Sequence, residues 1–109
     1  MIDWSHYDGI ITNLVYDEEA LRFKTIAEFK DCMHRGGEVM FEWNGIDYTC
    51  CSIRQNGERY YSIAQCGTAE VNRATTKRSK TVDEMLEYMV GDDRLRDMIT
   101  QVTVIDRTL

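Results

Sequence analysis

The side chains best suited to metal or nucleophilic chemistry are two histidines, His6 and His34, and four cysteines, Cys32, Cys50, Cys51 and Cys66. A zinc site needs three or four converging ligands, and the chain has no Cys-x-x-Cys or His-x-x-x-His spacing. A thiol nucleophile needs a nearby base, but Cys32 and His34 are two residues apart on a predicted helix and do not face each other. We therefore expect no catalytic residue, no metal site and no cofactor. Four reduced thiols are expected, with Cys50 as a small core residue.

A pair of carboxylates, Glu42 and Asp47, offers a second kind of chemistry. Two neighbouring acids can divide the roles of general acid and general base, as in a glycosidase. These two are predicted to lie directly opposite each other in a hairpin, where like charges repel. A solvated face near a tight turn is the simpler interpretation, and contact with a lysine or arginine of a partner suits the pair better than catalysis.

The hairpin that would hold this pair is the clearest element in the sequence. Residues 38–50 alternate like two strands joined by Asn44-Gly45, and a type I′ turn tolerates these residues because both must have positive φ. The turn pairs Trp43 with Ile46, Phe41 with Tyr48 and Val39 with Cys50, so these six side chains lie on the same face of the hairpin. The other face carries Met40, Glu42, Asp47 and Thr49. Only the apolar face must be buried by other elements, which is typical of an antiparallel sheet packed against helices on one side.

Two capping boxes predict helices before and after the strands. Thr25 is expected to accept from the amide of Glu28, and Glu28 to reach back to the amide of Thr25, in a helix that ends at residues 36–37. Thr81 opens a second helix, whose apolar residues recur at helical spacing as far as Gly91. A shorter helical turn is expected over residues 92–99.

The remaining segments predict further strands and complete an α+β fold. An Asn-Gly turn at residues 56–57 predicts a third strand, with Tyr61 facing Ser52 and Ile63 facing Cys50. Residues 68–72 predict a short fourth strand and residues 101–107 a terminal one. We expect a three- to four-stranded antiparallel meander with helices packed on one face. Residues 25–109 would form this single domain, and residues 1–24 an N-terminal extension in which 9–16 suit strand or helix and 17–23 favour helix.

The charge distribution limits the class of partner. The chain has 109 residues and a net charge of −6, with acids concentrated at both ends. Residues 73–80 form one cationic island, which contains Arg73, Lys77, Arg78 and Lys80. Such a surface attracts a basic protein and argues against nucleic acid as the partner, because aromatic stacking sites for nucleic acid also need a cationic groove.

The sequence shows no pattern typical of a membrane span or a secretory signal. No apolar run approaches the roughly 20 residues of a membrane span. The acidic N-terminus lacks the basic and apolar regions of a secretory signal. We therefore expect a cytoplasmic protein without a membrane partner.

Parts of the sequence from residue 25 onward resemble a known group of proteins. They are the capped helix at 26–30, the motif Gly-Gly-Glu-Val-x-Phe-Glu-Trp-Asn-Gly-x-x-Tyr at 36–48, and the two helical segments 81–91 and 95–99. This pattern resembles small proteins of prophages and mobile elements of Gram-positive gut bacteria. Most of these have no assigned activity, so the resemblance implies provenance rather than mechanism. Anti-CRISPR proteins are prominent among phage proteins of this size and acidity, which is an analogy of type.

The leading functional hypothesis is a non-enzymatic, acidic protein-binding module. It would occupy a basic surface, such as the nucleic-acid channel of a CRISPR effector nuclease in the host cell. The predicted contact residues are Asp17, Glu18, Glu19, Glu42, Asp47, Asp83, Glu84 and Glu87. An alternative is a mobile-element regulatory protein that binds nucleic acid or an operon partner through the cationic island. A small enzyme of unknown class is a third hypothesis.

Overall fold

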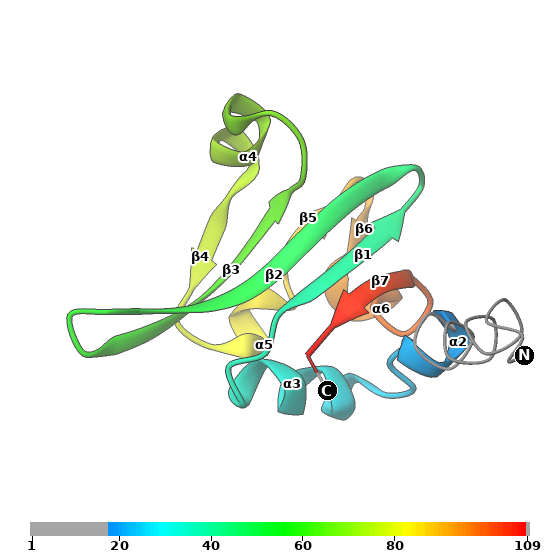
Figure 1. Ribbon diagram of the computed structural model, residues 1–109, viewed down its shortest axis with the longest axis horizontal. Coiled ribbons are helices and arrows are strands. Elements are labelled where there is room, and N and C mark those ends of the chain that lie inside the picture. Colours follow the sequence, from blue (N-terminus) through cyan, green and yellow to red (C-terminus); the bar gives the residue numbers. More distant parts are fainter. Residues whose placement is uncertain (1–17, 109) are drawn as a thin grey trace, which may run out of the picture.

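The computed structural model describes residues 18–108 and shows an α+β fold (Figure 1). Its helices are α2 (Glu18–Leu21), α3 (Ile26–His34), α4 (Ala69–Thr75), α5 (Val82–Met85) and α6 (Leu95–Met98). Its strands are β1 (Val39–Trp43), β2 (Ile46–Gln55), β3 (Glu58–Gln65), β4 (Lys77–Ser79), β5 (Met89–Val90), β6 (Asp93–Arg94) and β7 (Thr103–Arg107). The predicted fold class is confirmed. The interpretation of residues 9–16 lies outside the described residues.

The main sheet is antiparallel and has the strand order β4-β3-β2-β1-β7. The first three predicted strands of the meander are β1 to β3, β4 continues the meander from a different segment than predicted, and the predicted terminal strand pairs with β1 as β7. The pairing of β1 with β7 shifts between Met40 and Phe41, so Ile105 forms a bulge in β7. Strands β5 and β6 form a separate two-stranded ribbon.

Both Asn-Gly turns have the predicted geometry and register. Asn44 and Gly45 have φ values of 53° and 82°, and Asn56 and Gly57 have values of 55° and 81°. Positive φ at both central residues defines the type I′ turn, whose twist matches that of the strands. The predicted pairs are all present, from Trp43 with Ile46 to Cys50 with Ile63.

Helix α3 begins and ends as its sequence predicts, with one difference in the cap. Thr25 Oγ1 accepts from the Glu28 amide at 3.1 Å, but the Glu28 carboxylate accepts from the amide of Lys24 rather than that of Thr25, at 3.4 Å. At the other end, Gly36 adopts a φ of 82°, and the amides of Gly36 and Gly37 donate to the carbonyls of Met33 and Cys32. These two bonds form a Schellman motif.

The second predicted helix is much shorter than its apolar pattern indicated. Thr81 caps α5 as expected, but the helix ends at Met85, and Met89–Val90 pairs with Asp93–Arg94 around Gly91. The amides of Leu95 and Arg96 donate to the carbonyls of Tyr88 and Leu86, so bonds to the following segment replace helical ones. The prediction of one helix to Gly91 is therefore wrong, because tertiary hydrogen bonds outweigh helical periodicity.

The predicted strand over residues 68–72 is also wrong. Thr68 Oγ1 accepts from the amide of Val71 at 3.2 Å and caps α4. Helix α4 lies beyond the ends of β3 and β4 (Figure 1). The fourth meander strand comes later, at Lys77–Ser79, inside the cationic island of residues 73–80.

The core lies between the sheet and the helices. It includes Phe29 and Met33 of α3 and Phe41, Tyr48 and Ile63 of the sheet, and the rings of Phe41 and Tyr48 stack 5.3 Å apart. Leu21 and Phe23 also belong to this core, so residues from the predicted extension contribute to it. No helix of the described residues is both long enough and apolar enough to cross a bilayer.

Candidate partner-binding surface

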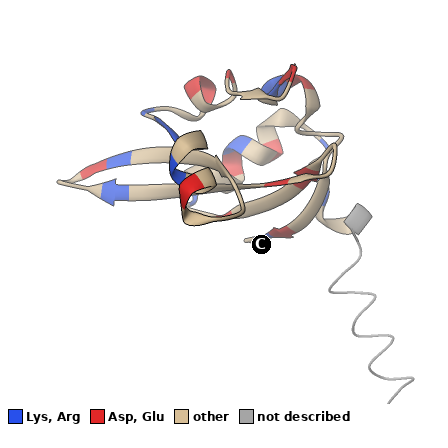
Figure 2. Cartoon of the chain, turned by 90° about the horizontal axis from the view of Figure 1, so that it is seen from above, with Lys and Arg blue, Asp and Glu red and all other residues tan. Residues whose placement is uncertain are grey.

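The described helices pack against only one of the two faces of the main sheet. Helices α3, α5 and α6 lie on one side, and the view along the sheet in Figure 2 shows the opposite side of β1 and β2 without a described helix over it. Strand register places side chains of all five strands on this side, and those around β1 include Met40, Glu42, Asp47, Thr49, Cys51 and Asp106. We call this side the open face.

The open face combines exposed apolar side chains with carboxylates. Met40 of β1 is 37 % exposed, and Ile105 at the bulge beside it is 41 % exposed. The exposed carboxylates of Glu38, Asp47 and Asp106 surround them and form no ion pair within the described residues. Among the strand residues of the main sheet, register places one base on this face, Arg78, at the opposite edge.

The predicted pair Glu42 and Asp47 is directly opposed, as the hairpin register required. Glu42 Oε2 accepts from the amide of Gly45 at 3.1 Å, so this carboxylate helps to hold the turn. Asp47 is exposed, and its carbonyl accepts from the amide of Cys66 at 2.8 Å. The pair therefore sits in solvent at the end of a hairpin, where water screens both charges.

A shallow depression lies on the open face between β1, β2 and β7. Its lining consists of Glu38, Val39, Met40, Thr49 and Asp106. Met40 is flanked by Thr49 on one neighbouring strand and by Asp106 on the other. The lining thus combines the exposed apolar side chain of Met40 with two residues that carry carboxylates, Glu38 and Asp106.

The backbone around this depression is held by reciprocal bonds. The amide of Glu38 donates to Thr108 Oγ1 at 2.9 Å, and the Glu38 carbonyl accepts from the amide of Thr108 at 2.9 Å. These bonds fix the start of β1 against the end of β7.

The acids predicted on the helix side are engaged within the molecule. Asp83 Oδ1 accepts from Lys30 Nζ at 2.8 Å, and Glu87 lies 3.3 Å from Arg94 and 3.5 Å from Arg96. Glu84 Oε2 accepts from the amide of Lys80 at 3.4 Å. These three acids do not join Glu42 and Asp47, because the sheet separates the two groups.

The remaining predicted acids are at the N-terminal side. Asp17 lies outside the described residues, and Glu18 and Glu19 are the first two residues of α2.

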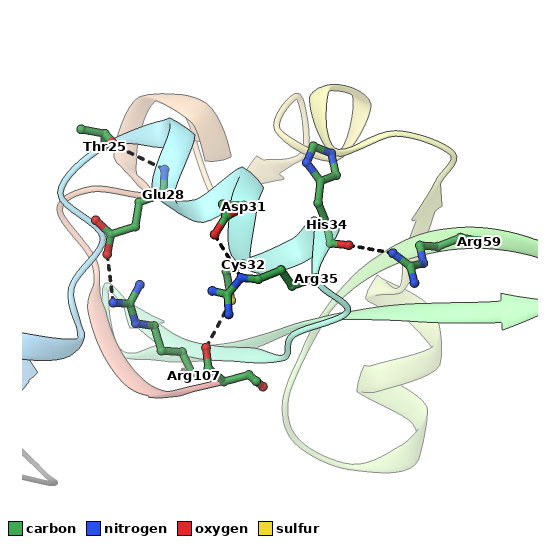
Figure 3. Close-up of polar contacts among 9 residues, drawn as sticks. Thr25, Glu28, Asp31, Cys32, His34, Arg35, Arg59 and Arg107 are labelled. Carbon is green, nitrogen blue, oxygen red and sulfur yellow. Dashed lines mark hydrogen bonds and ion pairs between the residues drawn. The ribbon is translucent and has the colours of Figure 1, made fainter.

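Helix α3 shows the same balance of charge along its length (Figure 3). Glu28 Oε1 pairs with Arg107 at 2.9 Å, and Asp31 Oδ2 pairs with Arg35 at 3.0 Å. The guanidinium of Arg59 donates to the carbonyl of His34 at 2.8 Å, at the C-terminal end of the helix where positive charge is favoured.

The cationic island does not form one converging patch. Arg73 lies in α4, whereas Lys77 and Arg78 are consecutive residues of β4 and point to opposite faces. Arg78 donates to Gln55 Oε1 at 2.9 Å. Lys80 follows β4 and is exposed. A nucleic-acid groove would need these bases on one side.

Burial dominates the surroundings of the four thiols, and at Cys32 its effect on the pKa outweighs the opposite effect of the Arg35 and Arg107 charges. All four cysteines are free. Burial raises the pKa of the thiols of Cys32, Cys50, Cys51 and Cys66, and the charges of Glu38 and Asp47 add to this effect at Cys51 and Cys66. The described residues contain no group of three or more histidines, cysteines or acids placed to hold a metal ion.

Sequence reasoning missed two carboxylates of the open face, Glu38 and Asp106. The alternation from Glu38 to Glu42 contained the signal for the first, because every second residue of a strand shares a face. Asp106 could be added only with the pairing of β7 to β1, since nothing in residues 101–107 specifies their neighbour.

No protein-family model, curated protein or solved structure matches this chain. Its own surface is therefore the basis for a functional proposal.

Proposed function

We propose that this chain is a non-enzymatic protein-binding module that binds a basic surface of another protein through its open face. The observation that carries the proposal is the set of carboxylates around exposed Met40, namely Glu38, Glu42, Asp47 and Asp106, none of which has an ion pair within the described residues. The ion pairs on the helix side argue against that side as the contact region.

Two physical effects support recognition by this face. Burial of Met40 and Ile105 against a partner would remove apolar area from water, at about 25 cal/mol per Å². The carboxylates would raise the rate of encounter with a basic partner and disfavour partners that carry negative charge. Salt would weaken this electrostatic attraction. The two effects together give affinity from apolar contact and specificity from charge.

The partner class we propose is a nucleic-acid-dependent defence protein in the host cytoplasm. A CRISPR effector nuclease exposes a basic channel for nucleic acid, and spaced carboxylates can occupy such a channel. The analogy to anti-CRISPR proteins motivates this choice, and the acidic open face is compatible with it.

The test measures binding and target-DNA cleavage by a panel of purified CRISPR effectors in the presence of this protein. We expect at least one effector to bind with an affinity that falls as salt rises, and to lose cleavage activity. The double variant Glu42→Gln/Asp47→Asn should weaken binding about tenfold. The matched control, Asp92→Asn/Asp97→Asn, removes two exposed charges near the β5-β6 ribbon and should bind as the wild type does.

Two outcomes would contradict the proposal. If no effector is bound or inhibited, the proposed partner class is wrong. If the control variant loses as much affinity as the test variant, net charge rather than the open face is responsible.

A further inference from the structure

We propose that the depression on the open face seats one lysine or arginine side chain of the partner, with its methylene groups on Met40 and its charged end between Glu38 and Asp106. This inference rests on the proposed function and names the anchor within that contact. The five lining residues supply both kinds of surface that a long basic side chain needs.

The geometry of the strands favours such an occupant. Asp106 is paired with Met40 across the β1-β7 ladder. Glu38, which directly precedes β1 and is bonded to Thr108, is two residues before Met40 and on the same face. The two carboxylates are therefore diagonal neighbours across adjacent strands, separated by a spacing of about 7–8 Å that long side chains can bridge. A basic side chain lying along Met40 would bring its charged end to both of them. Lysine and arginine commonly bury their aliphatic stem while the charge stays in a polar setting.

Other occupants fit the same surface less well. A hard metal ion prefers six or more oxygen ligands, and the side chains of this lining offer two carboxylates and the Thr49 hydroxyl beside apolar Met40. An anion would be repelled by both carboxylates. A second copy of this chain would place like charges against each other. Charge complementarity therefore selects a cationic side chain.

The site is organised before the partner arrives. The two backbone bonds between Glu38 and Thr108 hold β1 and β7 together beside the depression. Little reorganisation would then oppose binding.

The experiment is an NMR titration of the full chain with three short capped peptides that differ at one central residue: arginine, lysine or the neutral analogue citrulline. We expect the arginine and lysine peptides to shift the Met40 methyl signal and the amide signals of Glu38 and Asp106. The citrulline peptide should shift none of them. In Glu38→Gln/Asp106→Asn the Kd of the charged peptides should rise about fivefold or more, whereas Asp92→Asn/Asp97→Asn should leave it unchanged.

The outcomes separate this inference from the proposed function. If the charged peptides shift only Asp47 and its neighbours at the hairpin turn, the depression is not the anchor, although the open face still binds basic groups. Equal binding of the citrulline peptide would overturn the anchor by removing the role of charge. If no basic peptide shifts any signal of the open face, both proposals fail. Folding of each variant is checked by its amide spectrum. Met40→Ser provides a second test, because it removes the apolar side chain of the lining and keeps both carboxylates, so it should also weaken binding of the charged peptides.

Discussion

Lys30 Nζ lies 2.8 Å from Asp83 Oδ1 and connects α3 to α5, although the two residues are 53 positions apart in the sequence. Asp83 was predicted to contact a partner, and the structure instead gives it a cation of its own chain. The same holds for Glu87 with its two arginines. A surplus of acids in a sequence is therefore not equivalent to a surplus of free acids on a surface.

The Lys30–Asp83 pair predicts a specific pH dependence. The hydrogen bond from Lys30, together with its charge, lowers the pKa of the Asp83 carboxyl. A lowered folded-state pKa means that the stabilisation is complete above the unfolded-state pKa and is lost as pH falls through the folded-state pKa. In Lys30→Met the pKa of Asp83 should return toward its ordinary value. The difference in stability between wild type and variant should be present at neutral pH and disappear in strong acid.

A carboxyl-detected NMR titration and urea unfolding at several pH values measure these effects. Lys24→Met is the control, since the Lys24 side chain is exposed and its backbone amide, which the substitution keeps, donates to Glu28. An unchanged titration of Asp83 in Lys30→Met would show that the pair does not persist in solution.

Substitution of Arg107 by lysine should destabilise the fold. Its guanidinium carbon lies 4.4 Å from the centroid of the Phe23 ring, one of its nitrogens lies 2.9 Å from Glu28 Oε1, and its side chain is only 12 % exposed. Arg107→Lys keeps the charge but loses the planar group that stacks on the ring, so we expect a loss of about 1 kcal/mol in the free energy of unfolding. Urea denaturation measures it, with exposed Arg54→Lys as the control. Equal midpoints for the two variants would contradict a stacking role.

Gly37 is expected to be sensitive for a steric reason. A Cβ atom at this position would lie 2.8 Å from both the carbonyl oxygen and the sulfur of Cys32. Gly37→Ala must therefore displace the end of α3, and we expect a loss of about 1–3 kcal/mol. Gly45→Asn is the comparison, because Gly45 has open space around it and asparagine tolerates its positive φ. In thermal unfolding the Tm of Gly37→Ala should be well below that of Gly45→Asn. The reverse order of Tm values would refute the steric argument.

The adjacent cysteines of β2 should behave differently. Cys50 is fully buried and burial raises the pKa of its thiol, whereas Cys51 is half-buried on the open face. Iodoacetamide should modify Cys51 in the native protein and reach Cys50 only after unfolding. Cys50→Ser should lower the free energy of unfolding by about 1–3 kcal/mol because it buries a hydroxyl, and Cys51→Ser should change it by less than about 0.5 kcal/mol. Mass spectrometry and urea unfolding check both, and rapid native alkylation of Cys50 would contradict the register.

Local sequence rules account for the parts of the fold that were predicted correctly. Asn44-Gly45 defines a turn and hence a register, which places Phe41 beside Tyr48 in the core without any knowledge of distant residues. Thr25 and Thr81 each provide an oxygen for an amide three residues later, so the helix starts were also predictable. These features depend on contacts within a few residues.

The rest depends on contacts between distant segments. The apolar stripe from Val82 to Val90 is compatible with a helix, and only the bonds made by Leu95 and Arg96 show why the helix stops early. Strand β4 has three residues, too few for a periodic signal. The open face was predictable as an alternation in β1 and β2, but its depression was not, because Asp106 joins it from the other end of the domain.

The two outermost strands of the sheet have a consequence for association. Strand β4 is only three residues long and carries Lys77 and Arg78, and β7 is interrupted by the bulge at Ile105 and has α2 against it. Short, charged or irregular edges are poor templates for main-chain pairing with another molecule, which is how fibrils grow. The protein should therefore resist stacking into filaments at high concentration, and the edges of its sheet are poorly suited to pairing with a strand of another protein.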